Sequence, residues 1–251
     1  MNLKQEKQEM EYDIPYHYLP KFIDGNVIPG LELDWASEYL LSLRLVEEYV
    51  EYLKPNSLLD IGCGDGRLAN EMSIKFPKMA FTGIDYSKRA IRFAQAMQNT
   101  TNVEFLAVDL KHEEKEMLEK YDMVTSIEVL EHIPIDSVRE FFHLNISRVK
   151  KNGYFLIIVP HENKKLIDKH EQHFSSEKIL ELIDKCPRKL EAVEFRYLDN
   201  NSWIFELFRR AIKNRFYTLN PLWRAFLKKK ITYSRGEEGV SGRIFCLIRC
   251  N

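Results

Sequence analysis

The stretch LLDIGCGDGRLA (residues 58–69) decides the fold of this chain. A short apolar run with an acid, Asp60, at its end leads into three glycines at alternate positions, Gly62, Gly64 and Gly66. The run predicts a buried strand, and the pattern after the glycines predicts a helix. Glycine lets backbone N–H groups approach a ligand without an intervening Cβ, and the following helix offers its positive end. We therefore expect a ligand-binding loop between a strand and a helix.

This ligand is not expected to be a dinucleotide. In the fingerprint G-x-G-x-x-G the third glycine would come one residue after Gly66, where this sequence has Arg67. Asp60 and Asp65 flank the loop, and their charges would repel a pyrophosphate. The loop favours a ligand that carries positive charge beside an adenosine.

Beyond the loop, short apolar runs alternate with helical patterns. Strands are expected at 57–61, 80–85, 103–109, 121–128 and 154–160, and helices at 67–76, 87–98 (capped by Ser87), 115–120 and 136–149. A helix at 175–184 and strands at 189–198 and 242–250 follow. Strands separated by helices pair in parallel through crossovers, so the pattern predicts an α/β fold with an open, doubly wound sheet.

We expect one domain, residues 35–251, preceded by an N-terminal arm at 1–34. The arm contains Pro15, Pro20 and many aromatic residues, which is typical of an ordered segment that packs on a domain and can close one side of a pocket. The domain begins with a helix at 35–53 and carries a basic, aromatic helical insert at 202–235.

The insert leaves three interpretations open. Residues 203–230 contain eight Lys or Arg residues and one acid, with apolar residues at helical spacing. The segment can meet an anionic membrane or a lipid-linked substrate. It can instead be a lid that recognises phosphate through Arg209, Arg210 or Arg215. It can also pack its apolar stripe on the domain and expose a solvated basic face.

Composition excludes several classes of protein. The net charge of −1 argues against a general nucleic-acid binder, so no nucleic-acid partner is expected. No uncharged apolar stretch reaches the roughly 18 residues that span a bilayer, and the polar start of the chain lacks a secretory signal. The four cysteines have no ligand-like spacing and indicate reduced thiols. We therefore expect a cytoplasmic protein, and the sequence leaves its oligomeric state open.

Polar residues recur at the ends of successive expected strands. Asp85 ends the second strand, where a carboxylate can accept hydrogen bonds from two ribose hydroxyls, and Tyr86 beside it can lie against the sugar or base. Asp109 and Leu110 end the third strand, at the edge and face of an adenine, and Glu128 ends the fourth. Ligands of open parallel sheets bind beyond the carboxyl ends of the strands, so these residues predict one crevice.

The motifs LLDIGCGDG, GIDYS, AVDL and YDMVTSIEVLEHIP resemble those of the class I S-adenosylmethionine-dependent methyltransferases, over residues 35–160. The resemblance implies a Rossmann-like, mostly parallel seven-stranded sheet in which 242–250 is the antiparallel edge strand. It implies S-adenosyl-L-methionine as cofactor and S-adenosyl-L-homocysteine as product.

The resemblance also implies which residues hold each part of the cofactor. Asp85 would hold the ribose, Asp109 with Leu110 would receive the adenine, and Glu128 or its backbone would border the methionine moiety. Four residues around the glycine loop would line the methionine end: Asp60, Gly62, Cys63 and Gly64.

Histidines near the expected crevice favour an oxygen nucleophile. Alignment alone supplies much of the catalysis of methyl transfer, but a hydroxyl also needs a general base, which is usually histidine. His132 follows the fourth strand, and His170 and His173 follow the fifth. We expect these three in catalysis, with His132 as the base. Structural roles stay open, because His132 can bond a neighbouring loop and His173 can cap the helix at 175–184.

The expected reaction is methyl transfer to a hydroxyl or phosphate-type oxygen of a small, sugar-like or nucleotide-linked acceptor. This acceptor follows from a similarity to methyltransferases of bacterial surface glycans and small metabolites. Two alternatives stay open. Glu128, Glu131 and His132, with a later histidine, resemble the metal site of small-RNA terminal 2′-O-methyltransferases of the Hen1 type, although a divalent metal is not favoured. The chain can also be a non-catalytic scaffold that keeps the cofactor fold.

Overall fold

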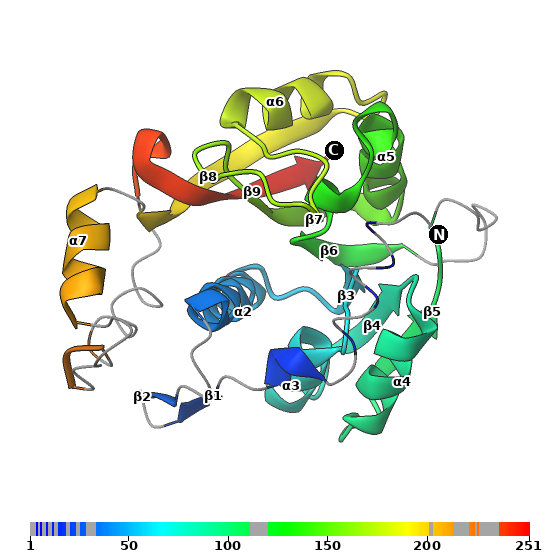
Figure 1. Cartoon of the computed structure of the whole chain (residues 1–251). Coiled ribbons are helices and arrows are strands. Elements are labelled where there is room, and N and C mark those ends of the chain that lie inside the picture. The colour runs from blue at the N-terminus through cyan, green and yellow to red at the C-terminus, as the bar shows by residue number, and fades with distance from the viewer. Residues whose placement is uncertain are drawn as a thin grey trace.

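The computed structural model describes residues 4, 6, 9, 12, 15–18, 21–23, 26–28, 34–110, 120–200, 203–212, 221–223, 225 and 236–251. These residues form a mixed sheet of seven strands at the centre of the molecule (Figure 1). In chain order the strands are β3 (Ser57–Ile61), β4 (Ala80–Asp85), β5 (Val103–Ala107), β6 (Tyr121–Ile127), β7 (Val149–Pro160), β8 (Leu190–Asn200) and β9 (Ser241–Cys250).

The strands lie in the order β5-β4-β3-β6-β7-β9-β8. β3 pairs in parallel with β4 on one side and with β6 on the other, so the strand order reverses at β3. β9 runs antiparallel to both β7 and β8. The predicted seven-stranded, mostly parallel sheet is confirmed, and so is antiparallel pairing at this side. β9 itself lies one place inside the edge, because β8 pairs along its outer side.

Helices cover both faces of the sheet (Figure 1). One face carries α2 (Asp34–Leu53), α3 (Arg67–Lys75) and α4 (Lys88–Ala96), and the other carries α5 (Val138–Ser147) and α6 (Ser176–Asp184). Successive strand residues point to opposite faces, so Leu58 and Met123 enter one apolar core while Leu59 and Val124 enter the other. The sheet is therefore buried on both sides, and ligands can reach it only at its ends or edges.

Most predicted elements are confirmed within a few residues. Ser87 caps α4, because its side chain accepts a hydrogen bond of 3.0 Å from the backbone N–H of Ala90. Ser175, and not His173, caps α6. Residues 150–153, which separate the expected helix at 136–149 from the expected strand at 154–160, are part of β7, whose pairing with β6 is irregular there. Of the helix expected at 115–120, only Lys120 belongs to the described residues. The rest of it lies within 111–119, outside the described part.

Two further segments lie away from the sheet. A short hairpin, β1 (Lys21–Ile23) and β2 (Asn26–Ile28), precedes α2 and was not predicted. Helix α7 (Trp203–Ile212) belongs to the expected insert and lies at the side of the molecule (Figure 1). Within the described residues, no helix is both long enough and apolar enough to cross a membrane. The division into an arm at 1–34 and a domain at 35–251 stays a prediction.

Candidate active site

The glycine loop after β3 is bound to the end of β4. Gly62 has a φ of 72° and Gly64 one of 56°, both in the left-handed region that favours glycine. The backbone N–H groups of Gly62 and Cys63 donate to the Ile84 carbonyl at 2.8 Å and 3.0 Å. A Cβ on Gly62 would lie 2.4 Å from a methyl group of Val129. The loop thus needs glycine for its backbone conformation and for the close approach of its neighbours.

Asp85 lies directly behind this loop, at the end of β4. It is buried, and its two oxygens accept hydrogen bonds from the backbone N–H groups of Gly64 (3.0 Å) and Ser87 (2.9 Å). Burial raises the pKa of Asp85 to about 6. A carboxylate offers about four lone-pair positions, so two such bonds leave it able to accept from a pair of hydroxyls. The residue fits the predicted ribose contact.

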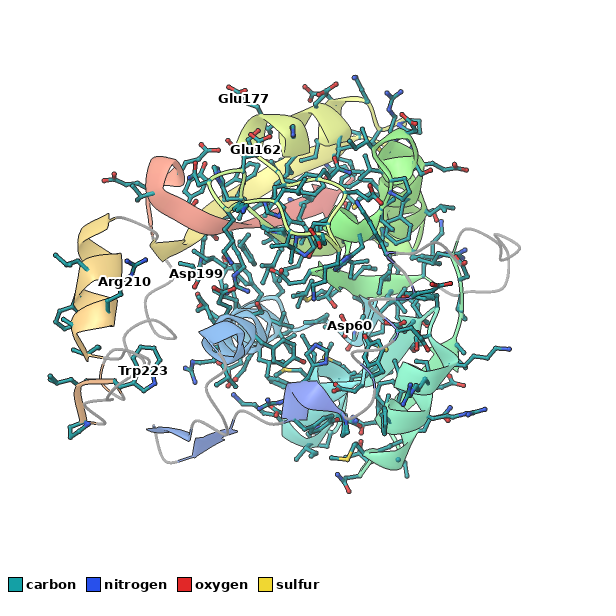
Figure 2. All side chains as sticks on the ribbon, in the orientation of Figure 1. Asp60, Glu162, Glu177, Asp199, Arg210 and Trp223 are labelled. Carbon is teal, nitrogen blue, oxygen red and sulfur yellow. The ribbon has the colours of Figure 1, made fainter. Side chains whose placement is uncertain are left out.

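Asp60 is the last residue but one of β3 and lies in the interior of the molecule (Figure 2). Its Oδ1 accepts a hydrogen bond of 2.7 Å from the Thr125 hydroxyl of β6, and burial raises its pKa to about 7. Burial, followed by the charges of Asp85, Asp60 and Asp65, raises the pKa of the Cys63 thiol as well. Three acids therefore surround the loop, and their combined field favours a cation.

The remaining predicted cofactor residues lie at the same edge of the sheet. Tyr86 is half-buried directly after β4, and Asp109 is exposed after β5. Leu110 is buried and belongs to the same apolar core as Ile84. The backbone N–H of Val108 donates to the Asp85 carbonyl at 2.9 Å, so the chain segments that follow β4 and β5 stay together.

Glu128 follows β6 in a left-handed conformation, with a φ of 55°. Its Oε1 lies 3.6 Å from Nη1 of Arg243, which comes from β9 and is buried. The same guanidinium contacts Asp199 Oδ2 at 2.5 Å and donates to the Ser42 hydroxyl at 2.9 Å. Arg243 was not predicted, although two arginines, Arg243 and Arg249, interrupt the apolar stretch at 242–250.

Residues of the N-terminal arm contact the glycine loop. His17 donates its backbone N–H to Asp65 Oδ2 at 3.0 Å, and its Nδ1 is 2.9 Å from Asp65 Oδ1. Arg67 donates to the His17 carbonyl. A Cβ on Gly64 would lie 2.9 Å from the hydroxyl of Tyr12. The described arm residues thus lie against the glycine loop.

Two charged residues of the arm contact further loops at the same end of the sheet. The Ser87 hydroxyl donates to Glu9 Oε1 at 2.9 Å, next to Asp85. Lys4 donates to the His170 carbonyl at 3.0 Å and pairs with Glu171 at 2.9 Å. The arm therefore connects loops that follow β3, β4 and β7. Neither charged residue was predicted, because nothing in the local sequence says that they reach these loops.

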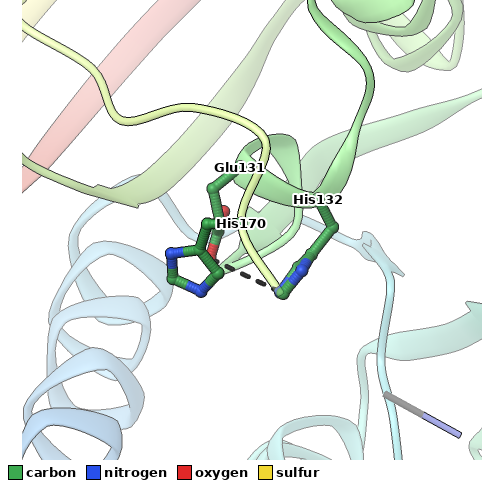
Figure 3. Close-up of side chains that lie close together, drawn as sticks. All are labelled: Glu131, His132 and His170. Carbon is green, nitrogen blue, oxygen red and sulfur yellow. Dashed lines mark ion pairs between the residues drawn. The ribbon is translucent and has the colours of Figure 1, made fainter. Parts of the chain in front are cut away.

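Three histidines and a buried acid gather where β6 and β7 end, and Figure 3 shows Glu131, His132 and His170 of this cluster. Glu131 and His132 belong to η3 (Leu130–His132), and His170 and His173 lie between β7 and α6. Glu131, His132 and His170 each present one potential ligand atom, and these atoms lie within 4.8 Å of one another. His132 Nε2 is 3.8 Å from Glu131 Oε1. The structure thus brings together all three predicted catalytic histidines, with Glu131 beside them.

Hydrogen bonds assign the tautomers of these rings. A carbonyl oxygen can only accept, so His132 Nδ1, 3.1 Å from the Lys169 carbonyl, carries the proton of the neutral ring. His173 Nδ1 likewise donates to the Lys164 carbonyl at 3.1 Å. His173 Nε2 then accepts from His170 Nδ1 at 2.8 Å. Nε2 is therefore the unprotonated, basic nitrogen of both His132 and His170.

Burial sets the protonation of the other members. It lowers the pKa of His170 to about 3 and lowers that of His173, so both rings stay neutral at pH 7. Burial, and then the charge of Glu128, raises the pKa of Glu131 well above its usual range. Among the described residues, no donor bonds to either oxygen of Glu131. The cluster therefore collects acceptor atoms that suit a proton or a cation.

Comparison with known proteins gives relatives of one kind. A family model described as a methyltransferase domain matches residues 54–219. A ubiquinone biosynthesis O-methyltransferase of Photobacterium profundum is 25% identical over an alignment of 185 residues, which covers 65% of this chain and 78% of that protein. One of Pseudomonas savastanoi pv. phaseolicola is 34% identical over 96 residues, 38% of this chain and 40% of that protein.

Solved structures share the fold at low identity. The N-methyltransferase NodS from Bradyrhizobium japonicum WM9, in complex with S-adenosyl-L-homocysteine, has a TM-score of 0.60 and 14% identity over 99% of each chain. The methyltransferase domain of bacterial CtHen1-CN has a TM-score of 0.55 and 15% identity over 83% of this chain and 97% of that one.

The family match covers more than half of the chain and contains the glycine loop, Asp85, Glu128 and His132. The sheet order and the buried acids at the carboxyl ends of its strands agree with that match. The protein therefore belongs to the class I S-adenosylmethionine-dependent methyltransferase superfamily.

Proposed function

We propose that this methyltransferase transfers the methyl group of S-adenosylmethionine to an oxygen of a small acceptor, with His132 as the general base. The observation that carries the proposal is the tautomer of His132. Its Nδ1–H donates to the Lys169 carbonyl, so the basic Nε2 is the nitrogen on the side of Glu131 and His170. The curated relatives, named as O-methyltransferases, support oxygen as the methyl acceptor.

Each predicted cofactor residue can be assigned to one part of the cofactor. Asp85, beside Tyr86, would accept hydrogen bonds from the ribose hydroxyls with the lone pairs that Gly64 and Ser87 leave. The apolar Leu110 would lie on the adenine, and Asp109 at its edge. The methionine end would lie against the residues of the loop and the end of β6: Asp60, Gly62, Cys63, Gly64 and Glu128. When bound, the cofactor supplies an electrophilic methyl group on a positively charged sulfur.

The three histidines would have different tasks. Nε2 of His132 accepts the proton that the acceptor hydroxyl loses as its oxygen is methylated. His170 has a pKa of about 3 and is a poor base, but its Nε2 can accept a hydrogen bond from the acceptor and orient it. His173 is a positioning residue, because its bond to His170 Nδ1 keeps that tautomer. Only His132 therefore changes its protonation state during the reaction.

The proposed acceptor is a hydroxyl of a sugar-like or nucleotide-linked molecule. The names of the relatives suggest a hydroxylated precursor of ubiquinone as a second class of acceptor. The family membership supports an enzyme over a scaffold. All four cysteines are free thiols, which is consistent with the proposed cytoplasmic location.

The proposal is tested with methyl-labelled S-adenosylmethionine and a panel of acceptors. The panel contains hydroxylated quinone precursors, sugars, sugar nucleotides and primary amines, and mass spectrometry locates the added methyl group. We expect label on oxygen with the wild-type protein and a large loss with His132→Gln. Label on the amines alone would contradict the proposal.

A second candidate, metal-assisted 2′-O-methylation of RNA ends, is favoured by the cluster of Glu131, His132 and His170. A divalent ion there would bind vicinal hydroxyls and lower the pKa of the attacking one. The two candidates separate in buffer with a chelator. The first predicts unchanged turnover, whereas the second predicts turnover only with added Mg²⁺ or Mn²⁺ and its loss in Glu131→Gln.

A further inference from the structure

Helix α7 has apolar side chains on two sides. Ile212 is buried in the core that also contains Trp223 and residues of α2, which holds this end of the helix on the domain. Leu207 and Phe208, one turn earlier, have 62% and 50% of their surfaces exposed, and Leu222 has 49%. An interior apolar stripe explains Ile212 but not the exposed side chains. Large apolar residues exposed close together in the chain mark interaction surfaces.

The sequence around α7 is strongly basic, whereas the rest of the chain is acidic. Residues 203–230 have eight basic residues and one acid, a formal charge of +7. The net charge of the whole chain is −1, so the remaining residues carry −8. Arg210 is exposed on α7, and Figure 2 shows it in the part of the molecule that contains Trp223, far from Asp60. Charge is therefore segregated onto the segment that exposes apolar side chains.

We propose that the segment around α7 binds the surface of a membrane that contains anionic phospholipids. Leu207, Phe208 and Leu222 would enter the boundary between headgroups and acyl chains, and the basic residues would pair with lipid phosphates. The surface contains none of the residues assigned to the cofactor or the acceptor, so the proposal goes beyond methyl transfer and does not depend on the acceptor. Its consequence is that the enzyme works at the membrane and can take acceptors from it.

A membrane explains both properties of the segment at once. An RNA would account for the basic residues, but it binds mainly through phosphate contacts and stacking and gains little from exposed leucines. Leu207 and Leu222 are aliphatic and cannot provide stacking. Lipid therefore fits the exposed leucines and the cations together.

Sedimentation with phosphatidylcholine vesicles, with and without phosphatidylglycerol, tests the proposal on the full chain. We expect binding to the phosphatidylglycerol vesicles, weakening with added salt, and little binding to pure phosphatidylcholine. Leu207→Glu and Leu222→Glu should each weaken this binding by about tenfold or more. The matched controls are Tyr52→Glu and Ile74→Glu, on α2 and α3, whose side chains are 77% and 58% exposed. Both should bind vesicles as the wild type does.

Three outcomes would overturn the proposal. They are no binding to anionic vesicles, binding that both leucine variants keep, and an equal loss in the control variants. A single-stranded RNA that binds in place of vesicles would also overturn it and assign the basic segment to nucleic acid. Titration of each variant with S-adenosyl-L-homocysteine checks that the variants fold. It also separates failure of this surface from failure of the proposed function, because Leu207 and Leu222 are not among the residues assigned to the cofactor or the acceptor.

Discussion

The backbone N–H of Gly64 donates a hydrogen bond of 3.0 Å to Oδ2 of Asp85, and this bond joins the glycine loop after β3 to the end of β4. The two residues are 21 positions apart in the sequence. Because Asp85 fixes the loop and also offers lone pairs to a ligand, a cofactor that contacts both would bind a pre-formed cradle. Preorganisation of this kind reduces the entropy lost on binding.

Asp85→Ala should weaken binding of S-adenosylmethionine by about 1–3 kcal/mol, roughly 5- to 150-fold in Kd, because a charge-assisted bond to the ribose and the anchor of the loop are both lost. Calorimetric titration measures the change. The control is Asp184→Ala, an exposed acid at the end of α6. Equal affinity in the two variants would remove Asp85 from the cofactor site.

Gly64→Ala should abolish measurable cofactor binding and destabilise the protein by about 1–2 kcal/mol, since alanine is strained at a positive φ. Its Cβ would also lie 2.9 Å from the Tyr12 hydroxyl. Gly239→Ala is the matched control, because a Cβ there meets nothing within 4 Å. Titration and thermal unfolding of both variants test this; wild-type affinity in Gly64→Ala would contradict the role of the loop.

Cofactor binding should depend on pH through Asp85. Its pKa of about 6 means that the charged form, which accepts from hydroxyls, prevails above pH 6 and is lost below it. Through this group, affinity should fall towards tenfold per unit well below pH 6. Asp85→Asn should bind more weakly, with a flatter profile between pH 5 and 6. A wild-type profile that is flat in this range would show that Asp85 does not contact the ligand in its charged form.

Asp85 and Asp60 should also make the stability of the protein depend on pH, but stability should fall as pH rises, whereas cofactor affinity rises. The pKa values of Asp85 and Asp60 are raised from 3.8 to about 6 and about 7, so the native protein binds more protons than the unfolded chain in this window. Their contribution to the free energy of unfolding therefore falls as pH rises from about 4 to 7. Asp60→Asn should lessen that fall. Thermal unfolding across the window measures it, and a variant slope equal to that of the wild type would contradict the assignment.

His132→Gln should lower turnover on a hydroxyl acceptor by about 100-fold or more and leave cofactor affinity nearly unchanged, because it removes the base and not a cofactor contact. His143→Gln, on α5, is the control and should keep wild-type turnover. Steady-state rates with the acceptor found in the panel, together with titrations, test both halves. Full turnover without His132 would assign proton removal to another group.

The sequence predicted the parts of the fold that local patterns determine. The apolar strand, the glycines and the Ser87 cap each carry their own signal within a few residues, so β3, β4 and α4 lie where expected. The hairpin at 21–28 also carries a local signal, Asp24-Gly25 between two apolar runs, although its pairing was not predicted.

The candidate site was predictable only where it depends on the strand pattern. Strand ends meet at one edge of a parallel sheet, so Asp60, Asp85 and Glu128 could be placed together from the strand pattern alone. Arg243 is 115 residues from Glu128 in the chain, and its approach depends on β9 running antiparallel beside β7. The contact of Glu9 with Ser87 is likewise set by tertiary packing, which local sequence does not specify.

Calorimetric titration of the full chain with S-adenosyl-L-methionine and S-adenosyl-L-homocysteine, in buffer with a chelator, tests the central claim most directly. The account predicts one site per chain with a Kd on the order of micromolar, for both compounds and without metal. Absence of heat and of any thermal stabilisation at millimolar concentrations of either compound would contradict it.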